Sequence, residues 1–235
     1  MERTKKSSAD RLYKIFIYVA LITLAVTIII PVAWVFMASI KENSEFYGNP
    51  WAMPAGFYIQ NFADAWGKAR MGEYMFNSVV VTALALVILL VVALPAAYVL
   101  SRFEFKGRKF LNVAFMGGLF INVNYIVVPI FLMLVDGDKL LKNSFGGGFF
   151  LNNIVVLAVV YASTALPFTI YLLSGYFATL AHDYEEAAYI DGAGYGTTML
   201  KIIFPMAQPS IITVILFNFL SFWNEYIIAM TLLSD

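Results

Sequence analysis

Four acidic residues and three glycines lie in one segment, DYEEAAYIDGAGYG, which runs from Asp183 to Gly196. Clustered acidic side chains can form charge-assisted hydrogen bonds with the basic residues of a partner. The chain has no cysteine and a single histidine, His182, which excludes thiol chemistry and leaves almost no imidazole chemistry. The sequence also lacks a P-loop and the HExxH and GxSxG motifs of hydrolases. The segment therefore indicates docking onto another surface rather than catalysis.

A short helix is expected at the start of this segment. Asp183 can serve as its N-cap, with Glu186 three residues later as in a capping box, and acids in a first turn suit the positive end of the helix dipole. Gly192 lies where a left-handed residue would end the helix. The pattern predicts a capped helix between these two positions.

A second amphipathic piece is expected to follow the glycines. Thr197 or Thr198 can cap it, and it should run to Pro205. On the first helix, residues spaced by three, four and seven share one face, and two alanines would keep that face shallow enough for close approach by another surface. The members of this face are Tyr184, Ala187, Ala188 and Asp191.

Polar residues in two apolar stretches suggest a path for solute. Asn218, Ser221, Phe222 and Glu225 have the spacing of one helical face and combine hydrogen-bonding groups with an aromatic ring. Asn122 and Asn124 fall near the middle of another apolar run, but residues two apart on a helix point in nearly opposite directions, so at most one can line the path. Hydrogen bonds between helices would explain these polar groups equally well.

The elements that must position these residues are membrane helices. Hydrophobic residues make up 61% of the 235 residues and charged residues 13%, against about a quarter charged in soluble domains. A helix of about 20 apolar residues crosses a hydrocarbon core of about 30 Å. Five runs of at least this length occur, which predicts an all-α, polytopic bundle in a lipid bilayer; they cover residues 15–40, 75–100, 110–135, 151–177 and 209–233.

Basic residues set the expected orientation. The segment 1–14 and the loop 101–109 are basic and are assigned to the cytoplasm, so the N-terminus is cytoplasmic. Segments 41–74 and 136–150 then lie outside, and the loop 178–208 lies in the cytoplasm. This last loop has a single basic residue against four acids, so something other than topology must explain its acids.

At this loop the chain resembles a known family. EAA at 186–188, G at 192 and IIFP at 202–205 match the signature EAA-x3-G-x9-I-x-L-P of permease subunits of binding-protein-dependent ABC importers, although Phe204 replaces the usual Leu and Ala181 stands where Pro is frequent. Further stretches follow the order of the carbohydrate-uptake branch and make the chain similar to the maltose-type second permease subunit: NSVVVT (77–82), AAYVLSRFEFKGR (96–108), IDGAG (190–194) and FWNEY (222–226).

The resemblance implies a type I importer permease in a bacterial or archaeal plasma membrane, which passes a sugar or oligosaccharide. Its partners would be a second permease in a heterodimer, two ATP-binding subunits that carry the ATP and Mg²⁺, and an external solute-binding protein. The chain itself would be no enzyme and would bind no cofactor or metal. By resemblance, the residues that couple it to the ATPase are Asp183, Tyr184, Glu185, Glu186, Ala187, Ala188, Asp191, Gly192 and Pro205.

The expected organisation is a basic N-terminus (1–14), a first membrane helix (15–40), an external segment (41–74) and a permease core (75–235). Members of this family normally have a sixth membrane helix, and this chain ends after the fifth run, so we expect a C-terminally truncated fragment. Lys and Arg number 15, as do Asp and Glu, so charge gives no indication of a nucleic-acid partner.

The sequence leaves three alternatives open. A secondary, ion-coupled transporter is the main one, but the expected spans contain a single clear acid, Glu225, and no second copy of the loop. A membrane-embedded enzyme would need several titratable residues at bilayer depth, which the sequence lacks. The loop helix could also serve merely to return the chain to the membrane, an interpretation that the family spacing disfavours.

Overall fold

The computed structural model describes residues 8–145 and 148–233, and regular secondary structure in these ranges is helical throughout, which confirms the predicted all-α class. The chain divides into two units, Met1–Tyr74 and Met75–Asp235. Each unit is described by itself. The basic residues Arg3, Lys5 and Lys6, on which part of the predicted orientation rests, lie outside the described residues.

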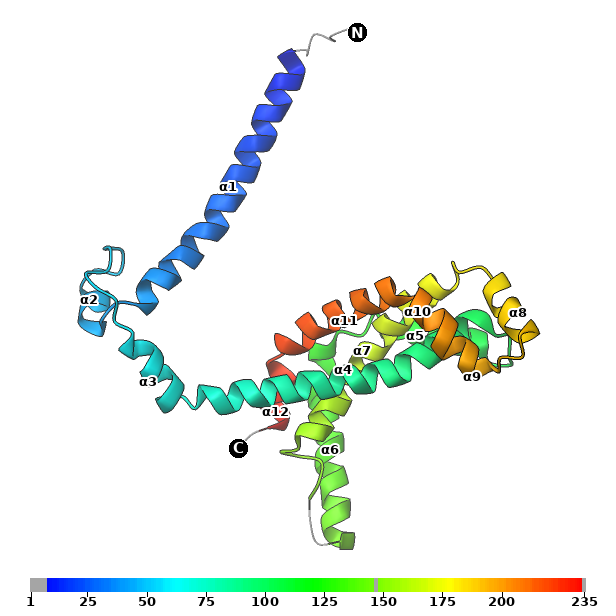
Figure 1. The fold of residues 1–235 in the computed structure, drawn as a ribbon. Coiled ribbons are helices and arrows are strands. Elements are labelled where there is room, and N and C mark those ends of the chain that lie inside the picture. The colour runs from blue at the N-terminus through cyan, green and yellow to red at the C-terminus, as the bar shows by residue number, and fades with distance from the viewer. Residues whose placement is uncertain (1–7, 146–147, 234–235) are drawn as a thin grey trace. The chain divides into compact units, whose positions relative to one another are not determined.

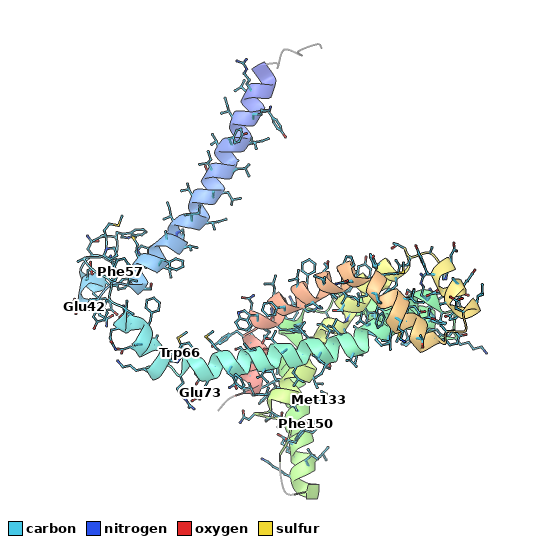
Figure 2. The ribbon with its side chains drawn as sticks, in the orientation of Figure 1. Glu42, Phe57, Trp66, Glu73, Met133 and Phe150 are labelled. Atoms are coloured by element: carbon cyan, nitrogen blue, oxygen red, sulfur yellow. The ribbon has the colours of Figure 1, made fainter. Side chains whose placement is uncertain are left out.

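The first unit contains α1 (Ser8–Ser39), α2 (Asn43–Gly48) and α3 (Gln60–Lys68). No residue in the most apolar part of α1 is buried, and its side chains project all around the helix (Figure 2). After α1, the Lys41 ammonium is buried and donates to the carbonyls of Asn49 (3.2 Å) and Pro50 (3.1 Å), and the indole of Trp34 also donates to Pro50 (3.2 Å). These bonds fold the segment after α1 back onto its end.

The second unit is a bundle whose core residues come mainly from α4 (Met71–Arg102) and α7 (Ile154–Phe177). Small buried residues allow close helix approach in membranes, and this core contains Ala85, Ala93, Ala97, Ala158 and Ala162. The hydroxyl of Ser174 donates to the carbonyl of Ala97 at 3.3 Å and joins the two helices. The other helices of this unit are α5 (Arg108–Gly118), α6 (Val123–Phe145), α8 (Asp183–Ile190), α9 (Tyr195–Thr198), α10 (Phe204–Met206), α11 (Gln208–Trp223) and α12 (Ile227–Leu232), with a π-helix at Met199–Ile203 (Figure 1).

The expected helix over 110–135 is broken. The chain bends by 105° between α5 and α6, at the residues that join Gly118 to Val123. A Cβ atom at Gly118 would lie 2.8 Å from Cγ of Pro167, so glycine lets α5 approach α7 closely. Asn122 then starts α6, because its side-chain oxygen accepts a hydrogen bond from the amide of Asn124 at 3.0 Å.

Helix α6 also continues past the expected end of that run, to Phe145, so residues 136–145 are helical rather than part of a connecting loop. The carboxylate of Asp138 is buried and accepts hydrogen bonds from the amides of Phe149 (2.6 Å), Phe150 (2.7 Å) and Leu151 (3.0 Å). Asp138 thereby fastens the segment before α7 to the side of α6.

The expected helix over 209–233 is interrupted as well, because α11 ends at Trp223 and α12 begins at Ile227. By length and composition, three helices within the described ranges can cross a membrane: α1 from Arg11, α4 and α7. The number rises to five if each of two bent pairs, α5 with α6 and α9–α10 with α11, forms one span.

Candidate functional site

Helix α8 begins one residue earlier than a cap at Asp183 requires. His182 occupies the N-cap position. Its carbonyl accepts hydrogen bonds from the amides of Glu185 (2.9 Å) and Glu186 (3.1 Å), and no side chain caps the helix. The predicted capping box is therefore wrong. Asp183 lies in the first turn together with Glu185 and Glu186, where carboxylates are favoured by the helix dipole.

The end of α8 is as predicted. Gly192 has φ +81°, its amide donates to the carbonyl of Tyr189 (3.0 Å), and the amide of Ala193 donates to the carbonyl of Ala188 (2.9 Å). These two bonds form a Schellman motif, in which a left-handed glycine reverses the chain after the helix. The turn directs the chain into α9.

The second piece differs from the prediction. Its N-cap is Gly194, and neither Thr197 nor Thr198 caps it because both lie inside α9. A π-helix, Met199–Ile203, and α10 follow, and Pro205 lies within α10. Each π-helical hydrogen bond spans five residues, and the amide of Phe204 accordingly donates to the carbonyl of Met199.

Of the four residues predicted for the face that meets a partner, three are exposed on α8 and Ala188 is not. Glu185 and Ala188 are buried against the second unit, whereas Tyr184, Ala187 and Asp191 are exposed. Ala188 therefore cannot belong to a surface that meets a partner. The exposed side of α8 also carries Asp183, Glu186 and Ile190.

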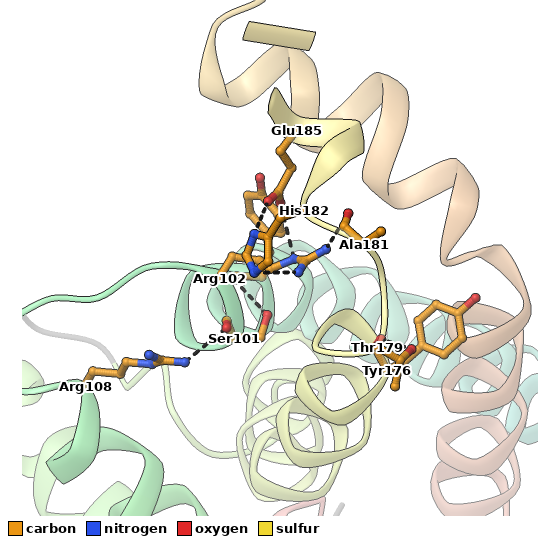
Figure 3. A network of polar contacts seen from close by, with 9 residues as sticks. Ser101, Arg102, Arg108, Tyr176, Thr179, Ala181, His182 and Glu185 are labelled. Carbon is orange, nitrogen blue, oxygen red and sulfur yellow. Dashed lines mark hydrogen bonds and ion pairs between the residues drawn. The ribbon is translucent and has the colours of Figure 1, made fainter. Parts of the chain in front are cut away.

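Glu185 forms an ion pair with Arg102, the last residue of α4. Oε1 of Glu185 lies 3.3 Å from Nε of Arg102, and the two side chains are 8% and 2% exposed. These two atoms attract each other electrostatically but are not aligned as a hydrogen bond. The imidazole of His182 lies between the two side chains, with Nδ1 3.1 Å from Glu185 Oε2 and Nε2 3.2 Å from an Arg102 guanidinium nitrogen (Figure 3).

Aromatic rings extend the contact between the loop and the helices. Tyr189 packs edge to face on Tyr195, Tyr195 on Phe103, and Phe103 on Tyr98 of α4, with centroid separations of 5.3, 5.6 and 5.6 Å. Tyr98 in turn meets Phe177 of α7 at 6.0 Å. The rings therefore link α8 and α9 to the ends of α4 and α7.

A cavity of about 420 Å³ lies between α6, α7, α11 and the start of α12. Tyr161 of α7 and Phe222 of α11 stack at one wall, with ring centroids 5.4 Å apart. Five of the six residues predicted for the solute path line this cavity; they are Asn124, Asn218, Ser221, Phe222 and Glu225. The lining thus combines aromatic rings with amide, hydroxyl and carboxylate groups.

The two predicted asparagines have different surroundings. Asn124 lines the cavity, whereas Asn122 is exposed and caps α6. Asn218 is buried and donates to Oγ1 of Thr169 (3.0 Å) and to the carbonyl of Val214 (2.7 Å). Asn218 therefore joins α11 to α7 as well as facing the cavity.

Comparison with known proteins assigns the chain to a family. The family model described as "Binding-protein-dependent transport system inner membrane component" matches residues 2–235. The chain belongs to this family. The diacetylchitobiose uptake permease NgcG of Streptomyces coelicolor is 36% identical to the permease over 229 residues, which cover 97% of this chain and 72% of that protein.

Other relatives carry sugar names as well. The trehalose/maltose transport permease MalG of Thermococcus litoralis is 27% identical, over 95% of this chain and 77% of that protein. Among solved structures, a bacterial ABC transporter for the acidic polysaccharide alginate contains a chain that superposes with a TM-score of 0.83 at 25% identity, covering 97% of this permease and 76% of that chain. The permease is thus similar to the sugar-uptake branch of the family.

Membership has direct consequences. Permease subunits of this family are transport components of the inner membrane and not enzymes, and binding-protein-dependent transport implies a solute-binding protein and an ATPase as partners. Within residues 8–145 and 148–233, no group of three acidic or histidine side chains could hold a metal ion.

Two residues of the site were missed by the sequence reasoning. From the sequence, Arg102 is only one of several basic residues of the loop 101–109, and Tyr161 has no predicted role. Arg102 is a charged residue at the end of an apolar run, which could have drawn attention to it. Nothing in the sequence, however, connects Arg102 to a loop 80 residues later. Tyr161 lies in a run of apolar residues and carries no local signal.

Proposed function

We propose that the permease passes a sugar or oligosaccharide, delivered by an external solute-binding protein, and that the 178–208 loop couples it to an ATPase subunit. The complex contains a second permease in a heterodimer and two ATP-binding subunits with ATP and Mg²⁺. The N-terminus and the 178–208 loop lie in the cytoplasm. The two-sided helix α8 carries this proposal, because one side is anchored to α4 and the other exposes carboxylates.

The exposed side of α8 has the chemistry of a docking surface. Asp183 and Glu186 are exposed acids in the first turn, and Ala187 beside them lets a partner's backbone approach closely. Basic residues of an ATPase would pair with these carboxylates through charge-assisted hydrogen bonds. Gly192 closes the helix, so the docking surface is short and rigid.

The cavity supports a sugar as the solute. Sugars present hydroxyl groups at their edges and apolar faces on their rings, which fit amide and hydroxyl groups beside stacked aromatic rings. Asn124, Ser221 and the Tyr161–Phe222 pair offer this combination. The relatives named for diacetylchitobiose and for trehalose and maltose agree with this class.

Substitutions in α8 test the coupling. Glu186→Lys reverses the charge of the exposed side and Gly192→Pro disrupts the turn, so each should lower ATP hydrolysis and uptake, by about tenfold, while membrane insertion is kept. Glu104→Lys is the control, since this exposed acid lies outside α8. Normal coupled transport in both α8 variants would contradict the proposed role of the loop.

The solute and the partners are tested by purification of the full tagged chain in detergent. A second permease and an ATPase that co-purify, with hydrolysis raised by a binding protein loaded with diacetylchitobiose or maltose, would support the proposal. Transport by the chain alone in liposomes without ATP would favour an ion-coupled secondary transporter instead.

A further inference from the structure

The guanidinium of Arg102 is surrounded by groups of the 178–208 loop. It lies near the carbonyl of Ala181 (3.5 Å), Nε2 of His182 (3.2 Å) and the carboxylate of Glu185 (3.3 Å) (Figure 3). Arg102 is the last residue of α4, a helix of 32 residues. One buried side chain therefore ties the end of a long membrane helix to the start of α8.

The histidine completes this cluster in one protonation state. Arginine only donates hydrogen bonds, so Nε2 of His182 must accept from Arg102, and the ring proton then lies on Nδ1, which donates to Glu185. The imidazole thus links the two charged side chains. Each member of the cluster orients the next.

Burial makes the pair hard to separate. Two charges that are almost fully removed from water stabilise each other, and separating them leaves each without a partner in a medium that solvates charge poorly. A displacement of α8 therefore costs less if α4 moves with it. Such pairs allow helices to move as one body.

The backbone offers a softer connection. From α8 the chain reaches α11 through α9, a π-helix and α10, and it bends by 76° between α10 and α11. A displacement of α8 can be absorbed in the π-helix and at this bend. The connection to α4 is direct, through the buried pair of Arg102 and Glu185.

We propose that the Arg102–Glu185 pair is the positioning contact that makes α4 follow α8 when the ATPase moves the loop. Glu185 thus acts inside the permease, whereas Glu186, on the other side of the helix, meets the ATPase. This inference rests on the proposed coupling role of the loop and adds which membrane helix receives the movement first.

Spin labels test the inference in the complete complex of permease and ATPase subunits. The chain has no cysteine, so Val91→Cys on α4 and Thr197→Cys in α9, both at exposed positions, give one label pair. With the pair intact, the label distance should stay the same without nucleotide and with Mg²⁺ and a non-hydrolysable ATP analogue. With Glu185→Gln or Arg102→Gln, the nucleotide should shift or broaden it.

Controls separate this inference from the proposed function. Glu104→Gln makes the same chemical change at an exposed acid and should keep the wild-type behaviour. The exchanged pair, R102E with E185R, should restore a nucleotide-independent distance, which a loss of local packing alone would not allow. It also decides the question if the single variants fail to assemble.

The outcomes are distinct. A distance that stays fixed in both single variants, while the ATPase remains bound and nucleotide binds, would overturn the inference alone. Failure of the exchanged pair to restore the fixed distance would overturn it too. An unsubstituted permease that retains no ATPase subunit would instead overturn the proposed function, and this inference with it.

Discussion

The hydroxyl of Tyr161 donates a 2.6 Å hydrogen bond to the carboxylate of Glu225, and this bond joins α7 to the gap between α11 and α12. The same carboxylate accepts hydrogen bonds from the amides of Ile228 (2.8 Å) and Ala229 (3.1 Å) in the first turn of α12. Glu225 was expected on the face of one continuous helix. It lies instead beyond the end of α11, where it holds α12 in place and lines the cavity.

Tyr161→Phe removes the hydroxyl and leaves the ring stacked on Phe222. We expect a loss of about 1.5–3 kcal/mol in stability, the usual contribution of a hydrogen bond to a charged group, seen as a lower melting temperature in detergent. Tyr226→Phe makes the same change at an exposed ring and should have little effect. Equal melting temperatures for the two variants would show that the hydrogen bond from Tyr161 to Glu225 does not contribute to stability.

Gly192→Ala isolates the cost of the left-handed turn. No atom lies within 4 Å of a Cβ built at this position, so the cost comes from the φ of +81° alone, about 1–2 kcal/mol. Asn tolerates this conformation better and should cost less. Hydrogen exchange at the amide of Ala193 reports the opening of the turn.

The matched control for Gly192 is Gly194→Ala. Gly194 has φ −78° and equally open surroundings, so alanine should be tolerated there. Faster exchange in both alanine variants, to the same extent, would mean that the left-handed backbone is not what holds the turn.

Asp138→Ala leaves three amides without their acceptor. Two of the three, those of Phe149 and Phe150, bond to the same carboxylate oxygen, so Asp138→Asn can keep both. We expect a loss of about 1–3 kcal/mol for alanine and less for asparagine, measured by thermal unfolding. Asp136→Ala, at an exposed acid two residues earlier, should be neutral, and a larger loss there than at Asp138 would contradict the anchoring role.

Ser221→Cys tests whether the cavity is reached by water. Ser221 lines the cavity and Leu220, the preceding residue of α11, does not. A charged, membrane-impermeant thiol reagent should therefore react faster with a cysteine at 221 than at 220, and a transported sugar should slow the reaction at 221. Equal rates at the two positions would count against a solute path through this cavity.

The long helices could be predicted from the sequence because uncharged apolar runs have to be helical in a membrane. The break at residues 119–122 could not, since Leu119, Phe120 and Ile121 continue the apolar run. Its position depends on the packing of Gly118 against Pro167, two residues far apart in the chain. Asn122 did give a local signal, because asparagine is a favoured N-cap.

The face of α8 could not be assigned from its spacing. Residues at intervals of three, four and seven define a stripe on either side of a helix, and the side that packs against the chain is decided by distant residues. Here Arg102 attracts Glu185 to the inner side, and Ala188 follows one turn later. The left-handed Gly192 could be predicted because its requirement is local.

The π-helix at Met199–Ile203 adds to the number of residues between Gly192 and Pro205 without adding a helical turn. A π-turn holds about one residue more than an α-turn, and one residue of an α-helix corresponds to a rotation of about 100°. Deleting one residue from Met199–Ile203 would convert this turn to α-helix while the downstream helix keeps its direction. The extra residue therefore lengthens the chain between Gly192 and Pro205 without turning the helix that follows.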